Sequence, residues 1–145
     1  MTVKIKKLDE KAITPTYGTE YSAGADLYAL SAAPITIGGG ETVLIHTGIS
    51  AEIPDGYAGF VFARSGLAMK RDLAPANKVG VVDSDYRGEY MVALHNHGKT
   101  AQTVERGERI AQLVIMPYVT AEFEECDALS DTERGSGGFG SSGTH

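Results

Sequence analysis

Short runs of β-branched and aromatic residues, separated by turn-forming residues, constrain the fold of this chain more than any other feature. The runs often alternate between apolar and polar residues, which is typical of half-buried strands. Clusters of Gly, Pro, Asn and Asp interrupt them at residues 38–41, 54–56 and 96–99. Many short strands at this spacing predict an all-β antiparallel sandwich or barrel. The expected strands are VKIKKL (3–8), ADLYAL (25–30), ETVLIHTGISAEI (41–53), YAGFVFA (57–63), EYMVALHN (89–96), AQTVERGERIAQLVIMPYV (101–119) and AEFEEC (121–126).

Helix signals are scarce, and SGLAMKRD (65–72) is the one helix candidate. A chain of 145 residues is typical of one domain, and it can bury enough surface to fold without covalent cross-links. The composition changes only near Ser130. We therefore expect one β domain over residues 1–130 and a flexible Gly/Ser-rich arm over residues 131–145.

The arm ends in RGSGGFGSSGTH (134–145), where 5 of the residues are Gly and 3 are Ser. Such a segment buries little surface, and ordering its glycines costs more conformational entropy than ordering any other residue. Arg134 and Phe139 are the two residues that a mere linker does not need. Their presence indicates that something orders the arm.

The composition excludes several classes of partner. A formal net charge of −6 argues against general binding to the nucleic-acid backbone, although one pocket for a nucleotide can be locally basic. The single Cys126 leaves no internal disulfide or cysteine-based metal site, which suits a reducing compartment. The N-terminal segment has no apolar core of signal-peptide length, and no run approaches the length of a membrane span. We expect a cytoplasmic protein with neither a membrane nor a nucleic-acid partner.

Asp26 follows a run of small residues in AGADLYAL (23–30). Small side chains let a ligand approach the backbone closely, and the carboxylate could point at that ligand. The pattern also fits an exposed Asp at the start of a strand, which is the commoner case.

The segment ARSGLA (63–68) places phosphate-binding groups at consecutive positions after an apolar strand. Arg64 offers a guanidinium, Ser65 a hydroxyl, and Gly66 an unobstructed amide at a possible helix start, a set that suits a polyanion. The alternative is that Ser65 only caps the helix beside a solvated Arg64.

Asp83 and Asp85 follow an apolar run in ANKVGVVDSDYRGEY (76–90). Two residues apart on a strand, they would share one face, where an acidic pair can hold a divalent cation or orient a water molecule. A solvated hairpin would carry the same residues. Because VGVV directly precedes Asp83, we expect its carboxylate to be half-buried, which favours a functional role.

Gln112 interrupts the apolar stretch in RGERIAQLVI (106–115). Strand alternation puts Ile110, Gln112 and Val114 on one face, which indicates an interface or the wall of a pocket. His95 and His97 also share a strand face, but no further ligand lies nearby in the sequence, so we interpret them as surface histidines.

In their order along the chain, these stretches resemble the five motifs of the trimeric deoxyuridine triphosphatases. The motifs are AGADLYAL, ARSGLA, GVVDSDYRGE, RGERIAQLVI and RGSGGFGSSG, and the match extends from Thr14 to Gly143. The resemblance implies a jelly-roll β fold and a homotrimer with active sites at subunit interfaces. It also implies Mg²⁺-dependent hydrolysis of dUTP to dUMP and pyrophosphate, which keeps uracil out of DNA and supplies dUMP for thymidylate synthesis.

The resemblance assigns a role to each matching residue. Asp83 would activate the water that attacks the α-phosphorus, Tyr86 would pack on the deoxyribose, and Asp26 would lie near the Mg²⁺ shell through water. The implied substrate-binding residues are Asn77, Gly80, Val81, Val82 and Met91 for uracil, Arg64, Ser65, Gly66 and Gln112 for the phosphates, and Arg134, Phe139, Gly140, Ser141 and Ser142 from the arm.

The arm, by the same resemblance, closes over nucleotide bound at a neighbouring subunit. Phe139 would stack on the uracil while Arg134 reaches the phosphates. A Gly-rich lid opens easily and excludes water when it is shut. Ser142 stands where the family often has Thr, which keeps the hydroxyl.

Three alternatives to a dUTP diphosphatase can be weighed on the sequence. The dCTP deaminases share the fold, but alignment on NHG (96–98) puts Ala93 where they carry a catalytic Glu, and Ala cannot transfer protons. A nucleotide-sensing regulator is disfavoured because no inserted segment separates the motifs. A β-sandwich interaction module with a disordered arm is the third alternative.

Overall fold

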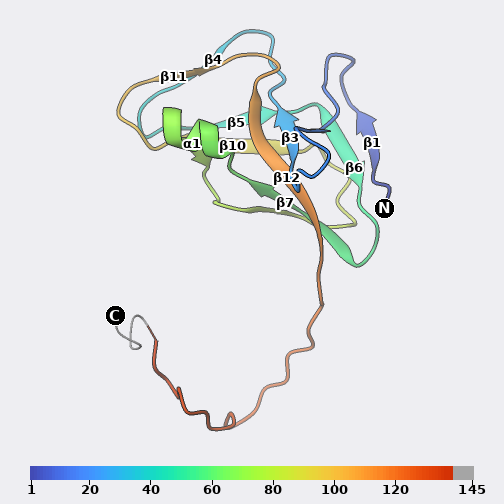
Figure 1. Ribbon diagram of the computed structural model, residues 1–145, viewed down its shortest axis with the longest axis vertical. Helices are drawn as coiled ribbons and strands as arrows, with labels where there is room; N and C mark the ends of the chain where they lie inside the picture. The colour runs from blue at the N-terminus through green and yellow to red at the C-terminus, as the bar shows by residue number, and fades with distance from the viewer. Residues whose placement is uncertain (139–145) are drawn as a thin grey trace.

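The computed structural model describes residues 1–138, which form antiparallel sheets and one helix (Figure 1). The predicted site residues Phe139, Gly140, Ser141 and Ser142 lie outside the described residues. The helix is α1 (Ser65–Arg71). The strands are β1 (Lys4–Lys7), β2 (Thr16–Tyr17), β3 (Ala25–Tyr28), β4 (Ile35–Ile37), β5 (Thr42–His46), β6 (Ile49–Glu52), β7 (Tyr57–Phe62), β8 (Leu73–Pro75), β9 (Gly80–Val82), β10 (Met91–Asn96), β11 (Gln102–Val104) and β12 (Arg109–Pro117).

The largest sheet has the strand order β2-β3-β12-β7-β9. A second sheet has the order β5-β10-β8, and two pairs, β1-β6 and β11-β4, complete the fold. Within the described residues none of these sheets closes into a barrel. The prediction of an all-β antiparallel fold is confirmed, and the sandwich describes it better than the barrel.

The core lies where inward-facing residues of the sheets meet. In β10, alternation along the strand supplies one buried side chain for every two residues, as in Val92 and Leu94, whereas three consecutive residues are buried in each of β3 and β6. The most deeply buried hydrophobic side chains are Leu27, Ile37, Ile45, Ile49, Leu73, Leu94, Val104 and Ile110. This core fixes β3, β7, β10 and β12, and β7 in turn pairs with β9, the strand that carries Gly80, Val81 and Val82.

Three sequence predictions of secondary structure need correction. The single run expected over 101–119 is two strands, β11 and β12, because the chain turns between them, where Gly107 has a φ of +74°. The single run expected over 41–53 is two strands, because Gly48 has a φ of +68° and turns the chain between β5 and β6. The strand expected over 121–126 is absent, because that segment is exposed and pairs with no strand in the described part of the chain. The helix prediction is confirmed over Ser65–Arg71, and Asp72 ends it in a left-handed conformation with a φ of 54°.

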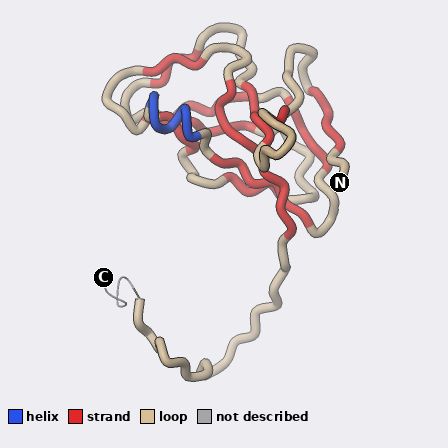
Figure 2. The backbone as a smooth tube through the Cα atoms, in the orientation of Figure 1, coloured by secondary structure: helices blue, strands red, loops and turns tan. Residues whose placement is uncertain are grey.

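Residues 118–138 leave the body after β12 and run outward as an extended segment without helix or strand (Figure 2). Large apolar side chains on this segment are almost fully exposed, including Val119 at 91%, Phe123 at 96% and Leu129 at 87%. Apart from the amide of Tyr118, which donates to the carbonyl of Gly56 at 3.1 Å, the segment has no hydrogen bond to the rest of the described chain.

Candidate active site

The predicted site residues that the structure describes fall into two separate pockets, apart from Arg134. The hairpin pocket, of about 360 Å³, lies between β9 and β10. Its walls include the predicted residues Asn77, Gly80, Val81, Val82, Asp83, Tyr86 and Met91. The arginine pocket, also of about 360 Å³, lies where α1 begins beside β3 and β12. Its walls include the predicted residues Asp26, Arg64, Ser65, Gly66 and Gln112.

The floor of the hairpin pocket is an edge strand. β9 pairs with β7 on one side only, at the end of the largest sheet, so its other backbone edge is free to bond a ligand. Glycine is favoured at position 80, because a Cβ there would lie only 3.3 Å from Cβ of Val61 and 3.4 Å from Nδ2 of Asn77. Val81 is 61% exposed. Backbone groups and a few apolar side chains therefore form this surface.

Asp83 lies at the rim of the hairpin pocket, and two expectations about it are wrong. Its carboxylate is exposed rather than half-buried, because the preceding residues alternate between exposed and half-buried instead of entering the core. It also does not share a strand face with Asp85, because β9 ends at Val82 and a turn follows, in which the amide of Tyr86 donates to the carbonyl of Asp83 at 3.2 Å. Within the described residues the Asp83 carboxylate has no hydrogen bond or ion pair, so both oxygens can accept from water.

Tyr86 stands beside Asp83 with its ring folded across Gly88. A Cβ at Gly88 would lie 2.3 Å from Oη of Tyr86, so only glycine permits this position of the ring. The Tyr86 hydroxyl donates to the carbonyl of Glu89 at 3.1 Å, and its ring stacks on that of Tyr90 with centroids 6.2 Å apart. The aromatic face of Tyr86 therefore forms a flat wall near the Asp83 carboxylate.

Asp26 joins the two arginines of the arginine pocket. Nε of Arg64 donates to Oδ1 of Asp26 at 2.7 Å, and Nη1 of Arg109 donates to Oδ2 at 3.1 Å. Asp26 is 9% exposed, so loss of its arginine partners would leave a largely buried carboxylate without compensation. Arg64 also donates from Nη1 to the carbonyl of Arg109 at 3.2 Å. The carboxylate thus fixes two cations at the wall of one pocket.

Sequence reasoning missed Arg109 because it assumed regular alternation along β12. The register against β3 shifts between Arg109 and Ala111, which is a β-bulge. The bulge brings Arg109 and Gln112 to the same pocket, while Ile110 and Ala111 are both fully buried. The predicted shared face of Ile110, Gln112 and Val114 is therefore wrong at Ile110. The sequence did hold one signal of this arrangement, because Arg109 and Gln112 lie close together in the same motif.

Gln112 is held against the backbone that precedes α1. Its Nε2 donates to the carbonyl of Ala63 at 2.8 Å. Gly24 permits this, because a Cβ at that position would lie 2.5 Å from Oε1 of Gln112. Arg64 occupies the helix N-cap position without a side-chain capping bond. The Ser65 hydroxyl is therefore not the helix cap, and both Ser65 and Gly66 are exposed at the pocket.

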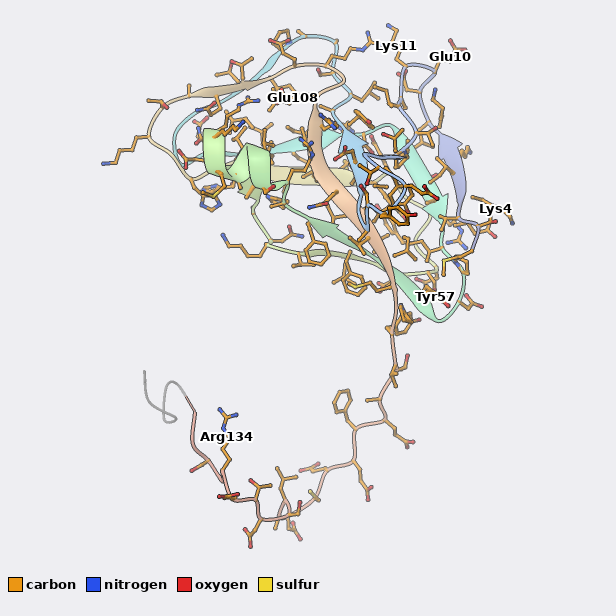
Figure 3. The ribbon with its side chains drawn as sticks, in the orientation of Figure 1. Lys4, Glu10, Lys11, Tyr57, Glu108 and Arg134 are labelled. Atoms are coloured by element: carbon orange, nitrogen blue, oxygen red, sulfur yellow. The ribbon has the colours of Figure 1, made fainter. Side chains whose placement is uncertain are left out.

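Arg134 is the described site residue that the fold does not bring to either pocket. It lies near the far end of the extended segment, well away from the body (Figure 3). Its Nε donates to the nearby carbonyl of Gly137 at 2.9 Å. Arg134 therefore lines neither pocket in this structure.

Metal-binding clusters are absent from residues 1–138, where no three His, Cys, Asp or Glu side chains converge. His95 and His97 pack edge to face with ring centroids 4.4 Å apart, and Nδ1 of His95 lies 2.8 Å from Oγ1 of Thr42. No helix in the described part of the chain is long and apolar enough to cross a membrane.

The sequence matches the dUTPase family over residues 10–143. Similar relatives include the deoxyuridine 5'-triphosphate nucleotidohydrolase of Rickettsia felis, 49% identical over 142 residues, with 97% of this chain and 96% of the relative covered. That of Nautilia profundicola is 49% identical over 143 residues, with 99% of each chain covered. Among solved structures, the dUTPase of Staphylococcus bacteriophage 80alpha with dUpNHpp has a TM-score of 0.90 at 29% identity and 99% coverage of each chain.

A dUTPase of phage phi11 of S. aureus, whose structure is described as revealing coordination of a structural Mg(II) ion, has a TM-score of 0.79 at 23% identity, covering 88% of this chain and 98% of that one. This similarity bears on the fold alone. The family match and the near full-length relatives together decide the identity. The chain belongs to the dUTPase family.

Proposed function

We propose that the hairpin pocket binds the uracil and deoxyribose of dUTP and that the arginine pocket binds its phosphates, so that the chain hydrolyses dUTP to dUMP and pyrophosphate. The observation that carries this proposal is the division of polar groups between the pockets. The hairpin pocket has a free backbone edge and one unpaired carboxylate, whereas the arginine pocket has two fixed guanidiniums. A nucleoside triphosphate has a base with hydrogen-bonding edges at one end and negative charge at the other.

The uracil would pair with the free edge of β9 as a further strand would. Backbone donors and acceptors at Gly80 and Val82, with the Asn77 side chain, present a fixed pattern to the Watson–Crick edge of the base. Cytosine would leave donors facing donors, which is costly in a desolvated pocket. Thymine would place its methyl group against the pocket wall.

The hydrolytic step would use the Asp83 carboxylate as general base. Asp83 accepts a proton from a water molecule, whose oxygen bonds to the α-phosphorus as the bond to the bridging oxygen of the leaving pyrophosphate breaks. Positioning of the water carries the effect. Tyr86 would pack on the deoxyribose and leave no space for a 2′-hydroxyl.

The arginine pocket would hold the phosphates through Arg64, Ser65, Gly66 and Gln112. The double ion pair on Asp26 keeps Arg64 in one orientation before the ligand arrives, so less side-chain entropy is lost on binding. The exposed amides at the start of α1 add donors for phosphate oxygens.

Mg²⁺ fits this pocket as an ion carried mainly by the substrate. Residues 1–138 have no carboxylate cluster to enclose it, and both oxygens of Asp26 already accept from arginines. Magnesium keeps several waters and few protein ligands at phosphate sites, so Asp26 would touch a bound water. When bound, the ion would neutralise phosphate charge.

A homotrimer would unite the two pockets, because one copy keeps them apart and leaves residues 118–138 without a partner. The arm, residues 131–145, would close over the site of a neighbouring subunit and bring Arg134 and the predicted groups of residues 139–142 to the nucleotide. Residues 1–130 would form the body. The exposed free thiol of Cys126 suits the reducing cytoplasm, which is the compartment we propose.

Pyrophosphate release from dUTP, dCTP, dTTP and UTP, each with and without Mg²⁺, tests the proposed function. Release from dUTP alone, dependent on Mg²⁺, is the expected result. Ammonia release from dCTP would instead identify a deaminase, which Ala93 in the wall of the hairpin pocket disfavours because Ala cannot transfer protons. Light scattering of the same sample tests the trimer.

A further inference from the structure

The segment 83–90, here called the site loop, joins β9 to β10 and carries both Asp83 and Tyr86. Much of its bonding is internal. The amide of Tyr86 donates to the carbonyl of Asp83 at 3.2 Å, and Nη1 of Arg87 donates to the carbonyl of Ser84 at 2.6 Å. These bonds shape the loop, but they do not attach it to the body of the protein.

Two residues make that attachment. The amide of Tyr90 donates to the carbonyl of Ile49 at 2.8 Å, and the carbonyl of Tyr90 accepts from the Thr47 hydroxyl. The side-chain attachment is that of Glu89. Its Oε1 accepts the amide of Gly48 at 2.8 Å, and its Oε2 lies 2.8 Å from Nδ1 of His46. Within residues 1–138, no other side chain from positions 83–89 hydrogen bonds outside the site loop. The Glu89 side chain is 20% exposed, whereas that of His46 is 57% exposed. Glu89 therefore reaches inward to the turn between β5 and β6, and His46 covers it on the solvent side.

The point of attachment is rigid. Gly48 has a φ of +68°, and a Cβ there would lie 2.5 Å from Cδ2 of Leu30 and 2.8 Å from Cβ of Ala12. The turn is thus packed tightly against Leu30 and Ala12. Burial acts to raise the pKa of the Glu89 carboxyl, but the bonds from His46 and from the Gly48 amide outweigh it and leave the pKa below its ordinary value. The carboxylate stays ionised as an acceptor.

The carbonyl of Glu89 in turn holds Tyr86 in place, because it accepts a hydrogen bond from the Tyr86 hydroxyl at 3.1 Å. We infer that Glu89 is a positioning residue for hydrolysis: its bonds to Gly48 and His46 fix the site loop, and through it Tyr86 and Asp83. The inference rests on the proposed function. Glu89 also lines the hairpin pocket, but its role in this inference is to hold Tyr86 and Asp83 rather than to transfer a proton.

Steady-state kinetics of dUTP hydrolysis on Glu89→Ala, Glu89→Gln and Glu41→Ala test the inference. Glu41 is the matched control, because its carboxylate also accepts a backbone amide, that of Gly38 at 2.9 Å, away from both pockets. Glu89→Ala should lower kcat/KM about tenfold, mainly through kcat, since small misplacement of a general base is costly. Glu89→Gln can still accept the Gly48 amide and should lose about threefold or less. Glu41→Ala should keep the wild-type constants.

A double-mutant cycle with Tyr86→Phe adds a measurement that distinguishes a positioning role of Glu89 from a merely structural one. If Glu89 acts through Tyr86, then Tyr86→Phe should cost less in the Glu89→Ala background than in the wild type. Fully additive effects, an unchanged kcat in Glu89→Ala, or an equal loss in Glu41→Ala would each overturn the inference. If Glu89→Ala does not fold, a double variant with Glu89→Gln and His46→Ala replaces it. An unchanged kcat in that double variant would also overturn the inference. Absence of dUTP turnover in the wild type would refute the proposed function instead.

Discussion

Two aspartates of this chain, one in each pocket, occupy opposite environments. Asp26 in the arginine pocket is 9% exposed and accepts from Arg64 and Arg109, whereas Asp83 in the hairpin pocket is exposed and has no side-chain partner among residues 1–138. A carboxylate held by two guanidiniums is an organiser, because both of its oxygens are already occupied. A free carboxylate beside an apolar pocket can accept a proton. The same residue type thus organises one pocket and, in the function we propose, serves chemistry in the other.

Asp83→Asn gives the largest expected effect and tests the chemical half of this comparison. The amide keeps the shape of the side chain but cannot take a proton from water, so turnover of dUTP should fall about a hundredfold or more while nucleotide binding persists. Pyrophosphate release and calorimetric binding of a non-hydrolysable dUTP analogue measure the two properties. Asp85→Asn is the control, because Asp85 is also exposed and lines neither pocket. Equal losses in the two variants would contradict the role of Asp83.

Removal of residues 132–145 tests whether both pockets need a cover. Turnover of dUTP should fall about tenfold or more, because water is then not excluded from the bound nucleotide. The thermal midpoint of unfolding should change little, since residues 132–138 have no strand partner and are largely exposed. A chain that lacks only Thr144 and His145 is the control and should behave as wild type. A large drop in the thermal midpoint would show that the arm is part of the folded core instead.

Asp26→Asn tests the structural half of the comparison. Loss of the charge weakens two charge-assisted hydrogen bonds, so the free energy of unfolding should fall by roughly 2 kcal/mol. Asp83→Asn should leave it within about 0.5 kcal/mol of the wild type, as is usual for an exposed residue. Urea titration of both variants measures the difference. The idea that Asp26 organises the arginine pocket fails if both variants unfold at the same urea concentration.

Tyr90→Phe gives the smallest expected effect near neutral pH. The Tyr90 hydroxyl is buried without a hydrogen-bond partner in the described part of the chain, so its removal should be neutral or stabilise the fold by up to about 1 kcal/mol. Burial raises the pKa of Tyr90 to about 12 from its ordinary 10.0. The unfolded chain therefore loses this proton first, and the stability that the neutral Tyr90 contributes is complete below pH 10 and is lost as the pH rises towards 12.

Urea titrations of wild type and Tyr90→Phe at pH 7 and at pH 11 check both statements. The free energy of unfolding of the variant should exceed that of the wild type by more at pH 11 than at pH 7. A marked destabilisation of Tyr90→Phe at pH 7 would mean that its hydroxyl has a partner after all.

Local sequence patterns anticipated most of the strands but not how they end or pair. β-Branched residues and turn clusters gave the positions of β3, β7, β10 and β12, because side-chain shape and backbone freedom act over a few residues. The short strands β2, β4, β8 and β9 carry too few residues for a pattern. The exposure of Asp83 could not be foreseen, because β9 lies at a sheet edge and its apolar residues do not enter the core. The arrival of Arg109 in the arginine pocket depends on a β-bulge, which alternation cannot express.

The sequence by itself determined the all-β class, the site of the helix and the family, because composition, turn residues and motif order are properties of the linear chain. Only the tertiary structure decided that Asp26 is paired twice, that Glu89 reaches Gly48, and that the predicted residues divide between two pockets. Each of these facts depends on residues tens of positions apart meeting at one point. Hydrogen bonds and burial depend on which residues lie close together in space, and only folding brings residues that are distant in the sequence into contact.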